Sequence, residues 1–313
     1  MTDSITASAP GKFVILGEHA VVYGKPAIAL AINRRLSLSV TKCTEFRLND
    51  EPADVNSSPH LKNILSRYDM VPVSVRSESR IPAGSGLGSS AALSVAFAAA
   101  MRAVEGMSLV PEEIAFEAFE AEYSAQGRGS PMDTSASTHG MGVALNVPGG
   151  KPLWEMEKNG RSWNVVGIDV PKMTFVIGYT GIRASTGPLV EKVRKYKDGN
   201  RFAADIVDDI GRVTLEGMDA ILRNDAVRLG GLMTEDHKLL SILGVSCREL
   251  NRLVDASLPH SYGAKLTGSG GGGSMVALTD DPEKVSDAIL SRGGMPFVVK
   301  TGVEGVTVSA RRE

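Results

Sequence analysis

The sequence predicts an α+β protein divided into two domains. Segments rich in β-branched and apolar residues alternate with segments that have helical periodicity. Beyond about residue 170 the composition turns helical, and near the end of the chain it becomes mixed again. The length of 313 residues is enough for one large domain or two ordinary ones. We therefore expect an N-terminal domain over residues 1–170 and a C-terminal domain over residues 171–313.

In the first half, strand and helix patterns follow one another closely. Residues 90–104 are apolar on all sides, which predicts a buried central helix. Pro111 stands where a first helical residue is expected and opens the next helix. The expected strands are residues 6–16, 27–40, 71–79 and 141–146, and the expected helices are residues 60–68, 90–104 and 111–126.

The second half has a longer series of helical patterns between two strand-rich ends. Four helices are expected between a first strand and a pair of strands around a glycine loop. The expected strands are residues 174–179, 264–267, 275–278, 297–299 and 306–308, and the expected helices are residues 189–197, 202–222, 226–243, 247–256 and 282–292.

Composition excludes several classes of protein. A formal net charge of −2 argues against nucleic-acid binding, which needs concentrated positive charge. Charged residues interrupt the apolar stretch of residues 13–38, so it does not predict a membrane span. Cys43 and Cys247 are far apart and lack metal-ligand spacing, so we expect neither a disulfide framework nor a cysteine zinc site. A cytoplasmic location is the default expectation.

A glycine-rich loop precedes the central helix and predicts a phosphate site. Glycines at alternate positions let backbone N–H groups approach a ligand closely, and the N-terminus of the following helix favours an anion. The alternative is that serine only caps the helix, but a cap needs neither three glycines nor a second hydroxyl. The predicted cradle consists of Pro82, Ala83, Gly84, Ser85, Gly86, Leu87, Gly88, Ser89 and Ser90.

A second glycine run, residues 265–274, lies inside a predicted hairpin. By composition it resembles a flexible linker, although a linker should separate domains. Four consecutive glycines favour a loop where backbone packs against a ligand, with a structural turn as the alternative. Gly268, Gly270 and Gly273 match G-x-G-x-x-G formally, but a strand follows them where a dinucleotide site needs a helix.

Several charged residues near these loops are candidates for chemistry. Glu122 and Asp133 could provide the pair of carboxylates that phosphoryl transfer needs, or they could be ordinary solvated acids. Lys12 could stabilise negative charge, and Glu18 with His19 could bind a polar substrate. A surface lysine and a structural histidine are the alternatives for Lys12 and His19.

Three long segments, in this order, resemble the GHMP kinase superfamily. They are residues 9–24 (APGKFVILGEHAVVYG), residues 82–92 and residues 265–274. Within the superfamily, the chain is most similar to the mevalonate kinase family. This finer resemblance depends on residues 17–24 and on Ser130, Pro131, Met132, Asp133 and Thr134.

The resemblance implies a fold and an activity. The fold is the GHMP kinase fold: a ribosomal-protein-like N-terminal α/β domain, a ferredoxin-like α+β C-terminal domain, and an active site in the cleft between them. The activity is ATP-dependent phosphorylation of the C5 hydroxyl of mevalonate, which gives 5-phosphomevalonate and ADP. ATP and mevalonate are the implied partners, Mg²⁺ is the implied cofactor, and a homodimer is one assembly left open.

The resemblance also implies roles for individual residues. Asp133 and Lys12 match the catalytic aspartate and lysine, and Ser90 with Glu122 match the Mg²⁺ ligands. The substrate-binding set comprises Glu18, His19, Thr186, Gly268 and Ser269. Two alternatives stay open: another GHMP kinase, acting on phosphomevalonate, homoserine or a sugar, and a non-catalytic sensor with the same fold.

Overall fold

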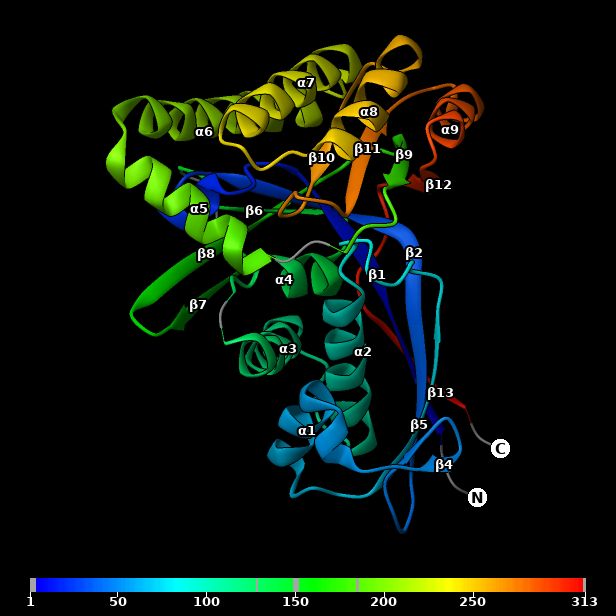
Figure 1. Cartoon of the computed structure of the whole chain (residues 1–313). Coiled ribbons are helices and arrows are strands. Elements are labelled where there is room, and N and C mark those ends of the chain that lie inside the picture. Colours follow the sequence, from blue (N-terminus) through cyan, green and yellow to red (C-terminus); the bar gives the residue numbers. More distant parts are fainter. Residues whose placement is uncertain (1–3, 128, 149–151, 184–185, 312–313) are drawn as a thin grey trace.

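The strands form two β-sheets in the part of the chain that the computed structural model describes, which is residues 4–127, 129–148, 152–183 and 186–311 (Figure 1). The first sheet is built around β1 (Ser4–Leu16) and β2 (Ala27–Lys42), a long antiparallel pair. Every residue of β1 from Ala9 onward is buried, because both faces of the sheet are covered there.

The other strands of the first sheet flank this pair. The first half of β2 pairs with β6 (Gly142–Leu145) and its second half with β5 (Val73–Ser79). The sheet is completed by β3 (Arg47–Leu48), β4 (Glu51–Pro52), β7 (Trp154–Lys158), β8 (Arg161–Ile168) and β13 (Thr307–Arg311). Because β13 pairs with β1, the two described ends of the chain lie side by side.

Helices of the first half cover one face of this sheet, and elements of the second half contact β1 as well. The central helix α2 (Ser89–Val104) packs on β1 and β2 and is covered in turn by α3 (Pro111–Gln126) and α4 (Met132–His139). The helix α1 (Pro59–Leu65) packs against α3. This position explains why α2 is apolar on all sides, as the sequence predicts.

The second sheet has the strand order β10-β11-β9-β12. Its strands are β9 (Thr174–Tyr179), β10 (Gly263–Thr267), β11 (Ser274–Leu278) and β12 (Met295–Lys300), all antiparallel. With α8 (Arg248–Ser257) and α9 (Pro282–Ser291) as crossovers, this is the ferredoxin-like arrangement that was expected.

Three further helices lie between β9 and α8. They are α5 (Thr186–Gly199), α6 (Arg201–Leu222) and α7 (Ala226–Ile242). In Figure 1, α6 and α7 lie at the top of the molecule, and α5 crosses in front of the first sheet. Short 3₁₀ turns occupy Ala20–Tyr23, Val55–Ser57, Ser66–Tyr68 and Leu258–His260.

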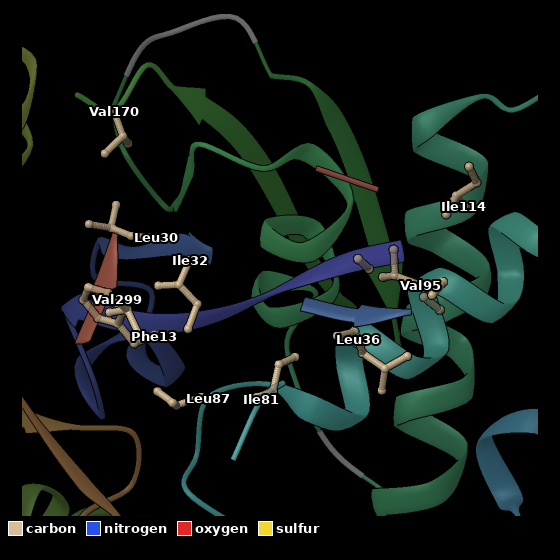
Figure 2. Packing of buried hydrophobic residues seen from close by; sticks show 14 of the residues in the cluster. Phe13, Leu30, Ile32, Leu36, Ile81, Leu87, Val95, Ile114, Val170 and Val299 are labelled. Atoms are coloured by element: carbon tan, nitrogen blue, oxygen red, sulfur yellow. The ribbon is translucent and has the colours of Figure 1, made fainter. Parts of the chain in front are cut away.

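One hydrophobic core extends across both sheets. It includes Phe13 and Leu30 from the first sheet together with Val299 of β12, which Figure 2 shows in one cluster. The rings of Phe13 and Phe175 meet edge to face at 5.1 Å. Since the halves share a core and β13 returns to the first sheet, the division at residue 170 stays a prediction.

The expected helices and long strands occur with small shifts at their ends, but the hairpin β7–β8 and the short strands β3 and β4 were not predicted.

Among the described residues, no helix combines the length and the apolar character that crossing a bilayer requires.

Candidate active site

A cleft of about 340 Å³ opens where the two halves meet. Its walls come from β1, the turn after β1, the first glycine loop, the start of α4, the start of α5 and the second glycine run. The lining residues include Lys12, Glu18, His19, Gly84, Ser85, Gly86, Asp133, Thr186, Gly268 and Ser269. Most of the predicted site residues therefore face one cavity.

The first glycine loop leads directly into α2. Gly84, Gly86 and Gly88 have φ angles of 72°, 79° and 73°, which glycine adopts without strain. Within the described residues, no backbone N–H from residue 84 to residue 90 donates to a backbone carbonyl. A helix N-terminus with free N–H groups is suited to bind an anion such as phosphate.

The side chains of this loop divide into two groups. Ser85 donates to the carbonyl of Pro82, and Leu87 is buried in the hydrophobic core, so these two residues offer only backbone to a ligand. Ser89 and Ser90 begin α2, and the side chain of Ser90 is exposed.

Lys12 and Asp133 are brought together although they lie far apart in the sequence. The Lys12 ammonium lies 2.8 Å from Asp133 Oδ2, and the side chains are 5% and 46% exposed. Lys12 reaches this point by passing Gly88, where an added Cβ would lie 3.0 Å from the lysine chain. The pair thus presents a fixed cation and an accessible carboxylate to the cleft.

Glu122 lies beside the start of α2 and is held by several donors. Ser90 Oγ is 3.0 Å from Glu122 Oε2, and Ser94 Oγ is 2.9 Å from Oε1. Gln126, which lines the cleft, donates to Oε2 at 2.7 Å, whereas His60 Nε2 lies 3.2 Å from Oε1 without a hydrogen bond. Ser90 and Glu122 are therefore adjacent, and their assignment as Mg²⁺ ligands stays a prediction.

His19 and Glu18 occupy the turn that follows β1. His19 Nε2 contacts the carbonyl of Ser269 at 2.9 Å, so Nε2 carries the hydrogen and Nδ1 of the neutral ring is an acceptor. Burial lowers the pKa of His19, which favours the neutral ring. Glu18 is buried and pairs through Oε1 with Lys265. His19 Nδ1 and Glu18 Oε2 have no hydrogen-bond partner among the described residues.

The second glycine run closes the far side of the cleft. Gly270 has a φ of 76°, and an added Cβ would lie 2.0 Å from the carbonyl oxygen of Val245, so the loop packs closely on the chain. Thr186 Oγ1 lies 3.3 Å from Ser269 Oγ, which joins α5 to this run. The run is the turn between β10 and β11 and lines the cleft, so it is not a linker between domains, and its role as a site loop stays a prediction.

Sequence reasoning missed four polar residues that support the site. They are His60, Ser94 and Gln126 around Glu122, and Asp236 beside Lys265. A signal existed for Asp236 alone, and it was indirect: Lys265 is a charged residue within an otherwise buried strand and therefore needs an acidic partner.

Comparison with known proteins identifies the family of the chain. Models of the GHMP kinases N-terminal and C-terminal domains match residues 59–141 and 218–293. A mevalonate kinase of Thermococcus sibiricus is 34% identical, over 97% of this chain and 98% of its own. The chain belongs to the GHMP kinases, and within them to the mevalonate kinase family.

Other members of the family are similar over the same length. The mevalonate kinase of Methanothermobacter thermautotrophicus is 35% identical, over 96% of this chain and 99% of its own. The crystal structure of L. major mevalonate kinase in complex with R-mevalonate superposes with a TM-score of 0.80, at 25% identity and 94% coverage of both chains. The GHMP kinase fold predicted from the sequence is thus confirmed.

Proposed function

We propose that the chain transfers the γ-phosphate of ATP to the C5 hydroxyl of mevalonate and releases ADP. The observation that carries the proposal is the Lys12–Asp133 pair at 2.8 Å in a cleft that is also lined by residues 84–86 of the first glycine loop, whose N–H groups donate to no backbone carbonyl of the described residues. Membership of the mevalonate kinase family supports mevalonate as the acceptor.

Each residue receives a role from its position. The loop of residues 82–90 binds the triphosphate through its backbone. Asp133 accepts the hydrogen bond of the attacking hydroxyl, and Lys12 stabilises the charge that develops on the transferred oxygens. Glu18 and His19 offer acceptor atoms to the substrate, while Thr186, Gly268 and Ser269 line the same wall.

Ser90 and Glu122 fit a Mg²⁺ ion that accompanies ATP. Neighbouring ligands of octahedral Mg²⁺ lie about 2.9 Å apart, because each Mg–O bond is about 2.1 Å, and the two side-chain oxygens here are separated by 3.0 Å. No group of three or more His, Cys, Asp or Glu side chains suited to a metal occurs among the described residues. Phosphate oxygens and water would complete the coordination, as is usual for Mg²⁺. The ion, when bound, neutralises charge on the phosphates.

The test is ADP release from purified protein with ATP and (R)-mevalonate, with Mg²⁺ and with a chelator. We expect Mg²⁺-dependent ADP release and a product whose mass and ³¹P spectrum match 5-phosphomevalonate. A panel of phosphomevalonate, homoserine and galactose tests the other acceptors. Preference for one of these would contradict the proposal, and ATP binding without ADP release on any acceptor would indicate a sensor.

Two further expectations from the sequence remain predictions. One is a cytoplasmic location, and the other is a homodimer. Fractionation of cells and sedimentation of the purified protein would test them.

A further inference from the structure

Three charged side chains are buried together behind the cleft. Lys265 of β10, Glu18 of the turn after β1 and Asp236 of α7 have side chains that are 0%, 3% and 0% exposed. The Lys265 ammonium lies 2.5 Å from Glu18 Oε1 and 3.3 Å from Asp236 Oδ2. These residues come from segments that are far apart in the sequence.

The cluster has more acceptors than donors. One ammonium faces two carboxylates, and Asp236 has ion-pair distance to Lys265 without hydrogen-bond geometry. Burial raises the pKa of Asp236 to about 7, with the neighbouring Lys265 acting in the opposite direction. A buried charge is tolerated only when it is paired, so the position of the ammonium decides where the Glu18 carboxylate is held.

The turn that carries Glu18 is attached to the second glycine run at two points. Lys265, the first residue of the run, binds Glu18, and the carbonyl of Ser269 in the middle of the run binds His19. His19 has a φ of 62°, an unusual value for a residue other than glycine, so the turn needs outside contacts to keep its shape. Lys265 engages Glu18 Oε1, whereas Glu18 Oε2 is buried without a hydrogen-bond partner among the described residues, and Glu18 lines the cleft.

We propose that Lys265, held from behind by Asp236, is a positioning residue that fixes the Glu18 carboxylate with one oxygen free for a hydroxyl of the acceptor substrate. The inference rests on the proposed function, because it assigns Glu18 to the acceptor. Lys265 itself does not line the cleft and acts through Glu18. Its effect should fall on acceptor binding, while the nucleotide loop is unaffected.

The first test is the Lys265→Met variant, which keeps the length of the chain and removes the charge. Without its cation, the buried Glu18 takes up a proton or rotates away from the acceptor. We expect the acceptor KM to rise about 10- to 100-fold, which is the loss of one charge-assisted hydrogen bond. The ATP KM should stay within about twofold, and kcat should change less than the acceptor KM.

Glu117→Gln is the matched control. Glu117 and Arg102 form another buried ion pair, at 2.7 Å with side chains 9% and 4% exposed, which does not line the cleft. We expect this variant to lower the melting temperature and to leave the acceptor KM within about twofold. A purely structural role for Lys265 would give the same pattern in Lys265→Met.

A double-mutant cycle with Glu18→Gln tests whether Lys265 acts through Glu18. Once Glu18 is replaced, Lys265→Met should change the acceptor KM by less than about twofold further. Multiplicative effects of the two substitutions would overturn the proposal, as would an unchanged acceptor KM or a parallel rise in the ATP KM.

If Lys265→Met does not fold, Asp236→Asn decides the question. It keeps the shape of the side chain and, in an assay at a pH above 7 where Asp236 is ionised, it removes the charge that holds the ammonium. The acceptor KM should then rise about threefold or more at an unchanged ATP KM. No change would overturn the proposal. Failure of wild type on mevalonate would refute the proposed function instead, and the cycle would then be run on whichever acceptor of the panel is phosphorylated.

Discussion

The Lys12 side chain is almost wholly buried, yet its ammonium ends beside the half-exposed carboxylate of Asp133. A cation and a carboxylate in this arrangement can share one incoming hydroxyl. Asp133→Asn keeps the size of the side chain but removes its capacity to accept a proton. We expect kcat to fall by about 10²- to 10⁴-fold, the range for loss of a general base, with ATP affinity within about twofold. Steady-state kinetics and nucleotide titration measure both quantities.

Asp287→Asn is the control for this substitution. Asp287 is exposed on α9 and does not line the cleft, so its loss should leave kcat and ATP affinity unchanged. Near-normal turnover of Asp133→Asn would refute the assignment of Asp133 to the attacking hydroxyl.

Residue types alone made Lys12, Asp133 and Glu122 candidates, because phosphoryl transfer needs a cation and two acids. The sequence could not pair them, since the contact of Lys12 with Asp133 depends on the path of β1 past the start of α2. Asp236 was not predicted as a site residue, because its burial also depends on contacts between distant segments. It looks like any helical acid until α7 packs on β10 and buries it.

At the scale of elements, the junction between the first glycine loop and α2 sets the position of Lys12. Gly88→Ala would combine a left-handed φ of 73° with a Cβ 3.0 Å from the lysine chain. We expect a loss of about 1–2 kcal/mol in the free energy of unfolding from the backbone alone. We also expect kcat to fall by about tenfold or more, because displaced Lys12 no longer meets the developing charge. Denaturant unfolding and kinetics measure the two effects.

Gly106→Ala separates backbone strain from crowding. Gly106 has a similar φ of 67°, but an added Cβ would meet no atom within 4 Å. It should lose similar stability and keep its kcat. Equal kcat values for the two variants would show that Gly88 does not position Lys12.

The elements that sequence reasoning found were those with strong periodicity or glycine punctuation. The hairpin β7–β8 was missed although Asn159 and Gly160 occupy its turn with φ angles of 52° and 71°. Asn-Gly between alternating apolar residues is a strong hairpin signal, and here Trp154 and Met156 face inward opposite Trp163 and Val165. Both the turn residues and the alternation are present in the sequence, so this hairpin could have been predicted.

At the scale of the whole molecule, the two halves share a hydrophobic core as well as the walls of the cleft. The helix α7 contributes Leu229 and Leu232 to the core shared by both sheets and also packs on β10. The strand β13 also pairs with β1, so the last described residues of the chain belong to the first sheet. A division by composition near residue 170 could not show either connection. Such long-range pairings leave no local periodicity to detect.

The buried charges at this junction make opposite contributions to stability as pH changes. Burial, with a smaller contribution from Lys265, lowers the pKa of His237 from 6.5 to about 4. Between these values unfolding takes up a proton at His237, so its contribution to stability is lost as pH falls. Burial raises the pKa of Asp236 from 3.8 to about 7, so unfolding there releases a proton, and this contribution is lost as pH rises.

A variant that lacks one of these two groups should therefore show the pH dependence of stability that the other group produces. In wild type, the Leu266 N–H donates to His237 Nδ1 at 3.2 Å. In His237→Asn, the side-chain oxygen can replace Nδ1 as the acceptor. Relative to wild type, this variant should gain up to about 1.4 kcal/mol in the free energy of unfolding for each pH unit from 6.5 toward 4.5. Asp236→Asn should lose stability relative to wild type over the same range, because wild type alone gains from protonation of Asp236. Denaturant unfolding of the three proteins at several pH values measures these differences, in which the contributions of other carboxylates cancel.

The difference in unfolding free energy between each variant and wild type is then plotted against pH. Two flat curves would mean that neither group is buried in the folded protein as described. Two curves of the same sign would mean that the two neighbours titrate as one unit.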